Sequence, residues 1–206
     1  FIGAAIVRGL SNWKRITPVL MVLCLLALLS PWAIGRWQNG ARNWIVFGPS
    51  EAPYFSLQPS EFMKPVLIAV LASCFSNRPR FVRCLPGIGF AALCCAVLLT
   101  ERDLGAVLLY FLTTVLMYYA ATSNAALSLA GLGMGAGAAV IAYNAFPYVQ
   151  DRVAIWQNPW SDPLDAGYQI VRALAAIGSG GLFGMGLGQG RQKFAYLPYP
   201  ESDFIF

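Results

Sequence analysis

Asp203 is the residue of this chain whose surroundings best suit acid/base chemistry. It lies between a Pro-Tyr-Pro segment and the apolar run 204–206, after a polar, glycine-rich stretch that follows a long membrane-like region. A carboxylate held beside a bilayer could act as a general base on a lipid-borne substrate. Because the chain contains no histidine, acid/base chemistry must depend on Asp, Glu, Lys or Tyr. An acidic residue here could equally cap a helix that begins at Phe204.

Three further acidic residues and one lysine are candidates for chemistry. Glu61 and Lys64 are three residues apart, so they lie on one helical face and can pair. Ionisable groups at membrane depth are costly and usually functional, although long side chains near an interface also reach the headgroups. Asp103 precedes an apolar run and either caps the helix beginning at Leu104 or acts directly. Glu201 lies two residues before Asp203.

Glycines alternate at 184, 186, 188 and 190, just before Arg191, Gln192 and Lys193. This spacing matches neither the dinucleotide fingerprint nor a phosphate-binding loop. It favours a tightly turned loop. An alternative is a stretch whose backbone amides approach a diphosphate or a sugar, with Arg191 and Lys193 close by.

The composition indicates a membrane protein. Apolar residues make up 58% of the 206 residues and charged residues 11%, whereas soluble domains carry about a quarter charged residues. The net charge of +5 is spread over loops without an aromatic-interleaved basic patch, which argues against nucleic acid. The five cysteines fit neither a zinc site nor a disulfide framework, so we interpret them as small buried hydrophobic residues.

The distribution of charge predicts an all-α polytopic fold, a bundle of transmembrane helices with a large, partly helical loop. The charge-free or nearly charge-free runs that predict membrane helices are Ile16–Gly35, Ser60–Phe75, Cys84–Thr100 and the region 104–150, which is long enough for two helices separated at 122–124. The second of these two is rich in glycine, which suits close helix packing. Apolar residues at helical spacing over 170–177 predict a helix on or dipping into the membrane surface.

Basic residues predict the orientation in the membrane. The two purely basic loops, around residues 8–15 and 78–83, fall on the same side when the spans are counted, and the positive-inside rule places that side in the cytoplasm. Residues 35–58, 101–103 and the segment 147–203 then face outward, the last as a large extracytoplasmic loop. The chain starts without Met and stops within an apolar run, so we expect a piece of a longer protein, cut at both ends.

Several motifs, in order along the chain, resemble those of the SEDS (FtsW/RodA/SpoVE) family. They are 39–45, Gln58-Pro59-Ser60-Glu61 with Lys64, Asn158–Pro163, 167–169, 176–182, and the stretch from Gln192-Lys193 to Asp203-Phe204-Ile205-Phe206. They extend over nearly the whole chain. Within the family, Gly186-Leu187-Gly188 followed by Gln192-Lys193 is more similar to the cell-division branch than to the elongation branch.

The resemblance implies a ten-span protein of the cytoplasmic membrane that polymerises lipid II into peptidoglycan glycan strands, with residues 1–206 forming one truncated membrane-embedded domain. It implies that Asp203 is the catalytic base and that Glu61 and Lys64 form the family's intramembrane pair. Substrate contacts are then expected from Arg42, Arg191, Gln192 and Lys193. It further implies Mg²⁺ or Mn²⁺ without an organic cofactor, and a class B penicillin-binding protein and other divisome components as partners.

The chain departs from the family pattern at four places. Glu201-Ser202 stands where His-Thr is usual, Asn43 where a second Arg is usual, Arg102 where Pro is usual, and Met185 where Lys is frequent. Three alternatives therefore stay open: a lipid II flippase, a scaffold that has lost activity and recruits a transpeptidase, and an elongation-type polymerase. A transporter would place polar groups near the membrane midplane, whereas here they gather outside the spans.

Overall fold

The computed structural model describes residues 13–38, 41–48, 54–76, 80–181 and 183–186. The chain divides into two compact units, residues 1–137 and 138–206. The predictions for Arg191, Gln192, Lys193, Glu201 and Asp203 lie outside the described residues.

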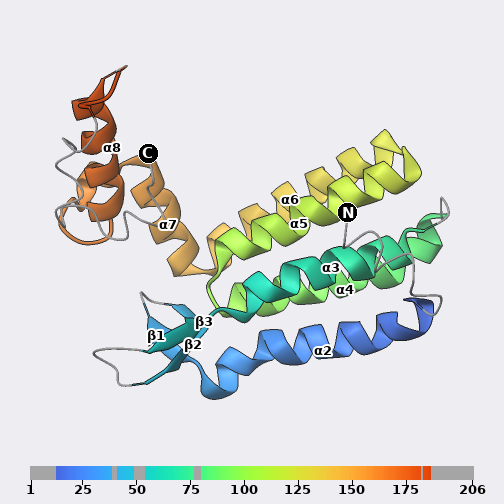
Figure 1. The fold of residues 1–206 in the computed structure, drawn as a ribbon. Coiled ribbons are helices and arrows are strands. Elements are labelled where there is room, and N and C mark those ends of the chain that lie inside the picture. The colour runs from blue at the N-terminus through green and yellow to red at the C-terminus, as the bar shows by residue number, and fades with distance from the viewer. Residues whose placement is uncertain (1–12, 39–40, 49–53, 77–79, 182, 187–206) are drawn as a thin grey trace. The chain divides into compact units, whose positions relative to one another are not determined.

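The first unit is a helical bundle. Its helices are α2 (Trp13–Ile34), α3 (Pro59–Cys74), α4 (Phe81–Thr100), α5 (Leu104–Thr122) and the first part of α6 (Ala125–Ala145). Helices α2, α3 and α4 run alongside one another (Figure 1). Four helices of the described chain, α2 from Arg15 onward, α4, α5 and α6, are long and apolar enough to cross a membrane, while α3 has only 16 residues.

Four of the predicted spans are confirmed as helices of membrane-spanning length, whereas the prediction for Ser60–Phe75 is confirmed only as a helix, because α3 is shorter. Residues 104–150 do form two membrane-length helices, and the chain turns at Ser123, which adopts a left-handed conformation with φ of +54°. The glycines of α6 have unequal surroundings. A Cβ at Gly135 would meet the Phe111 ring of α5 at 2.1 Å, whereas Gly133 has open space around it. Only part of the predicted glycine packing is therefore present among the residues described.

A small antiparallel sheet between α2 and α3 was not predicted. Its strands are β1 (Arg36–Gln38), β2 (Ala41–Phe47) and β3 (Phe55–Leu57), in the order β1-β2-β3. Residues 45–47 of β2 pair with 55–57 of β3. The signal was present in the sequence: β2 contains the strand formers Trp44, Ile45, Val46 and Phe47, and the hairpin dipeptide Asn39-Gly40 precedes it.

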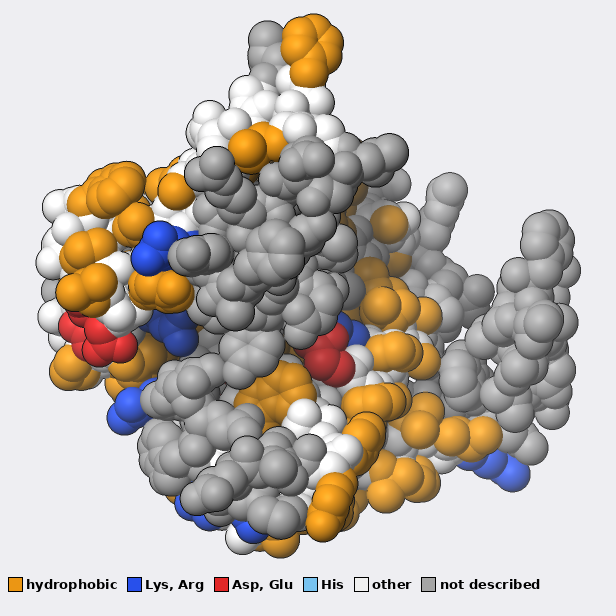
Figure 2. All heavy atoms as spheres, turned by 60° about the vertical axis from the view of Figure 1, so that its left-hand side comes forward, with side chains coloured by type: hydrophobic (Ala, Val, Ile, Leu, Met, Phe, Trp, Pro, Cys, Tyr) orange, Lys and Arg blue, Asp and Glu red, His pale blue; other side chains and the backbone are white. Residues whose placement is uncertain are grey.

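The core of the first unit lies between α2, α3, α4 and α5. Its fully or almost fully buried side chains include Cys24, Leu28, Leu67, Val70, Leu71, Cys84, Cys94, Leu98 and Tyr110. All five cysteines are free, and three are completely buried, as expected of small apolar residues. Between α2 and α3, the hydroxyls of Thr17 and Ser73 lie 2.7 Å apart. Hydrophobic side chains cover much of the described surface, which suits contact with lipid (Figure 2).

The second unit contains the remaining part of α6, α7 (Pro147–Gln157), a short 3₁₀ turn (Pro159–Ser161) and α8 (Tyr168–Gly180). Helix α8 confirms the predicted helix. It continues through Gly178 and ends at Gly180, and the following Gly181 has a positive φ of +57° that favours glycine. Val171 and Ala173 are buried, whereas Leu174 and Ile177, also apolar, are about half exposed.

Candidate functional site

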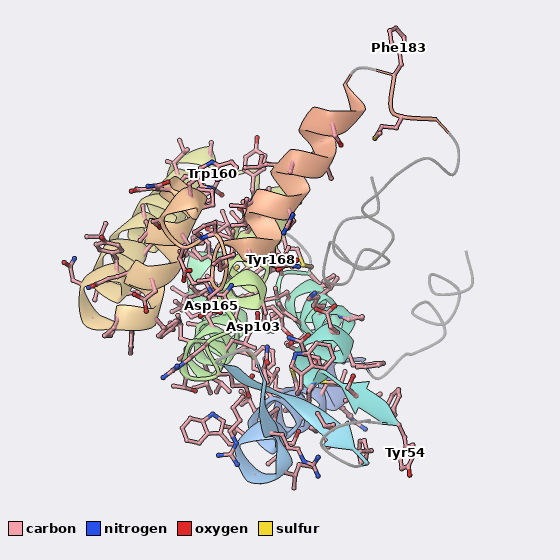
Figure 3. The ribbon with its side chains drawn as sticks, turned by 90° about the vertical axis from the view of Figure 1, so that its left-hand side faces the viewer. Tyr54, Asp103, Trp160, Asp165, Tyr168 and Phe183 are labelled. Carbon is pink, nitrogen blue, oxygen red and sulfur yellow. The ribbon has the colours of Figure 1, made fainter. Side chains whose placement is uncertain are left out.

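Asp103 occupies the turn between α4 and α5 (Figure 3). Its Oδ1 accepts a hydrogen bond from the backbone N–H of Ala106 at 3.0 Å, which confirms the predicted cap of α5. A carboxylate here satisfies one of the free N–H groups of the first turn and lies at the positive end of the helix dipole. Capping uses only one of its two oxygens.

The second oxygen, Oδ2, accepts hydrogen bonds from side chains far away in the sequence. Gln58 Nε2 donates at 2.6 Å, Asn43 Nδ2 at 3.1 Å, and Ser60 Oγ at 3.5 Å. Together with the neighbouring Glu101 these residues form what we call the Asp103 cluster (Asn43, Gln58, Ser60, Glu101 and Asp103). It joins strand β2 and the start of α3 to the α4–α5 turn.

Glu101 is the least satisfied member of the Asp103 cluster. Only 2% of the residue is exposed, and its Oε1 has no hydrogen-bond partner. Burial, and then the charge of Asp103, raise the pKa of this carboxyl to about 8. The other buried side-chain oxygen without a partner among the described residues is Asn43 Oδ1, in the same cluster. Both are acceptors, so the cluster lacks a donor.

Glu61 and Lys64 pair as predicted. Lys64 Nζ lies 2.6 Å from Glu61 Oε1, with the two side chains 30% and 54% exposed. The pair lies in the first turns of α3, directly after Ser60, whose carbonyl accepts a hydrogen bond from Tyr110 Oη at 3.0 Å. Exposed pairs of this kind add only about 0–1 kcal/mol to stability.

The predicted substrate contact Arg42 lies on β2, next to Asn43. It is half-buried, and its Nε donates to the carbonyl of Gly35 at 3.1 Å. Arg102 follows Glu101 and has φ of +63°, which is closed to proline because the ring holds φ near −65°. The turn of this chain is therefore built differently from one with Pro at this position.

The structure brings Arg42, Glu61, Lys64 and Asp103 to the same end of the first unit. Sequence reasoning missed Asn43 and Gln58 as partners of Asp103, because amides 60 and 45 residues away from the carboxylate carry no local signal. Within the described residues no three Cys, Asp or Glu side chains gather to hold a metal ion. The Asp103 cluster does not fit Mg²⁺ or Mn²⁺ either, since amide and hydroxyl donors already occupy Asp103 Oδ2.

Comparison with known proteins gives the family. Residues 2–206 match the FtsW/RodA/SpoVE family model, described as "Cell cycle protein". The chain belongs to this family. It is 40% identical over 206 residues to the stage V sporulation protein E of Bacillus subtilis, covering 95% of this chain and 54% of that protein. It is 35% identical to a probable peptidoglycan glycosyltransferase FtsW of Moranella endobia, covering the whole chain and 56% of that protein.

A solved structure has the same fold. It was determined in work on "structural coordination of polymerization and crosslinking by a peptidoglycan synthase complex", and it matches with a TM-score of 0.58 and 32% identity, over 83% of this chain and 51% of that one. The chain thus spans about half the length of the relatives that it matches. Family membership and the four apolar helices identify it as part of a multi-pass membrane protein.

Proposed function

We propose that the protein to which this chain belongs is a peptidoglycan glycosyltransferase that polymerises lipid II into β-1,4-linked glycan strands. The observation that carries the proposal is the match of the whole chain, at 35% identity, to a relative named as a probable peptidoglycan glycosyltransferase. The solved structure with the same fold comes from a complex described by polymerisation and crosslinking. We place the protein in the FtsW-like branch, with a role in cell division.

The arrangement of charge supports an enzyme over a transporter. Helices α5 and α6 contain no Asp, Glu, Lys or Arg, and those of α2 and α4 lie at the N-terminal ends. The polar side chains of the first unit instead gather where α3 and α5 begin. A transport path would need polar groups near the midplane of broken helices. Chemistry at the membrane face fits this distribution better.

The proposed reaction uses one carboxylate as its general base. Asp203 takes the proton of the 4-hydroxyl of one lipid II sugar while that oxygen forms a bond to C1 of another. The bond from C1 to the diphosphate oxygen breaks, and undecaprenyl diphosphate leaves with its electron pair. Attack from the opposite side inverts C1 and gives the β-1,4 link. Arg42, Arg191 and Lys193, with Gln192, are proposed to bind the diphosphates and sugars.

Mg²⁺ or Mn²⁺ is an expectation from the family resemblance alone. The described residues offer no fitting site, so no step is assigned to a cation. The proposed partner is a class B penicillin-binding protein of the division machinery. The matching solved complex supports such a partner, because it is described as coordinating polymerisation with crosslinking. The proposed location is the cytoplasmic membrane, with residues 147–203 on its outer side.

The test is lipid II polymerisation by the full-length protein, purified with its cognate partner. We expect the wild type to make glycan strands and Asp203→Asn to make none, because an amide takes up no proton at neutral pH. A matched control is Asp165→Asn, which removes an exposed carboxylate of the second unit. We expect it to keep wild-type activity (Asp165 is labelled in Figure 3).

Each alternative has its own outcome. Wild-type protein that moves lipid II across vesicles without making polymer would show a flippase. Protein that binds the transpeptidase but neither moves nor polymerises lipid II would show a scaffold. Equal polymerisation by wild type and Asp203→Asn would keep the enzyme and reject Asp203 as its base.

A further inference from the structure

Glu101 is a buried carboxyl group that the proposed reaction does not use. It follows the last residue of α4 and is 2% exposed. The side-chain donors of Asn43, Gln58 and Ser60 all point to the neighbouring Asp103, and Glu101 Oε1 receives none. An ionised carboxylate that is buried with one oxygen lacking a donor is unfavourable, because that oxygen loses hydration without gaining a hydrogen bond. The neutral acid avoids that cost and brings one O–H donor.

Two cations on the elements packed against this turn have partners other than Glu101. On β2, Arg42 Nε donates to a backbone carbonyl, and on α3, Lys64 pairs with Glu61. Tyr110 of α5 donates to the carbonyl of Ser60. Arg102, on the turn itself, is exposed. The charge that acts on Glu101 is the negative charge of Asp103, which disfavours a second one.

We propose that Glu101 is a proton-operated latch: it holds a proton while strand β2 is docked on the α4–α5 turn, and loss of that proton loosens the docking. The cluster lacks a donor for its two unpartnered acceptors, Glu101 Oε1 and Asn43 Oδ1, and a single proton on Glu101 supplies one. When Glu101 ionises, a buried negative charge forms two residues from the half-buried Asp103, and repulsion between the two carboxylates weakens the bonds from Asn43 and Gln58 to Asp103.

The direction of the pH effect follows from linkage. The pKa of Glu101 is raised from 4.5 to about 8 in the folded protein. The folded state therefore binds more protons than the unfolded state between these values. The contribution of Glu101 to stability is complete below pH 4.5 and is lost as the pH rises to about 8. Above that, the contribution changes no further.

The experiment compares the full-length wild type with Glu101→Gln in the same detergent or lipid nanodisc. Gln keeps the shape and a donor but cannot ionise. We expect the melting temperature of the wild type, relative to that of Glu101→Gln, to fall as the pH rises from 4.5 to about 8. Hydrogen exchange of β2 should be faster in the wild type than in the variant at the same alkaline pH. Infrared spectroscopy should show a protonated carboxyl in the neutral wild type that Glu101→Gln lacks.

The matched control is Glu61→Gln, which neutralises a 54% exposed glutamate at the start of α3. Its melting temperature should depend on pH as that of the wild type does. The same dependence of the melting temperature on pH in the wild type and in Glu101→Gln would overturn the proposal. So would wild-type protein without a protonated carboxyl at neutral pH, a result that needs no variant to fold. Recovery of alkaline stability by added Mg²⁺ would show that a cation, and not a proton, serves the cluster. None of these measurements is of enzymatic activity, so the role of Glu101 and the proposed function can each be rejected independently of the other.

Discussion

A single oxygen, Oδ2 of Asp103, accepts hydrogen bonds from a strand and from the start of a helix. Its partner oxygen caps α5. Asp103 thus caps α5 and also accepts hydrogen bonds from distant side chains, and different substitutions distinguish these two roles. Asparagine also caps helices well, whereas alanine provides neither a cap nor an acceptor.

We therefore expect Asp103→Ala to lower the free energy of unfolding by about 2–4 kcal/mol, the sum of a lost cap and of buried amides left without an acceptor. Asp103→Asn should lose less, because the cap remains. Thermal unfolding of the purified protein checks the order, with Asp165→Asn as the unaffected control. If Asp103→Ala melts like the wild type, the hydrogen bonds of the Asp103 cluster do not hold the turn.

The pairing of α3 with α4 depends on close approach at Gly87. A Cβ there would lie 2.9 Å from Cys74 Cβ and 3.2 Å from the Phe75 ring, while a Cβ at Gly89 would meet nothing within 4 Å. We expect Gly87→Ala to destabilise by about 1–3 kcal/mol through overpacking. Gly89→Ala should stabilise by up to about 1 kcal/mol through helix propensity. Equal melting temperatures for the two variants would contradict this packing.

Whether a helix or strand could be predicted from the sequence depends on whether local or distant residues stabilise it. Helices such as α4 and α5 were predicted because a run of apolar residues without charge is a local signal. The turn at Ser123 followed for the same reason. Strand β3 has only three residues and forms by pairing with β2, so its own sequence says little. The partners of Asp103 were not predicted because their contacts are made across α3 and α4.

At the scale of the whole molecule, the sheet and the α4–α5 turn lie at one end of the bundle, and the end of α3 and the start of α4 lie at the other. This follows from the alternating directions of α2, α3 and α4 (Figure 1). If the positive-inside rule sets the orientation, the end with the sheet faces outward.

A cysteine pair tests the orientation. In full-length protein with the five native cysteines replaced, Tyr54→Cys should react with a membrane-impermeant maleimide on intact cells, because Tyr54 is 85% exposed beside β3. Arg80→Cys, before α4, should react only after the cells are permeabilised. The reverse pattern would place the sheet in the cytoplasm and remove the proposed outward site.

The Asp103 cluster also constrains the order in which the protein is assembled. Asn43 and Gln58 leave the ribosome 60 and 45 residues before the carboxylate that they bind. Their amides have no Asp103 acceptor until α3 and α4 have both entered the membrane and the turn after α4 has returned to the side of β2. Strand β2 therefore reaches its final place late, although it is made early. Docking of β2 on the turn therefore requires that α3 and α4 have already been inserted in the correct orientation.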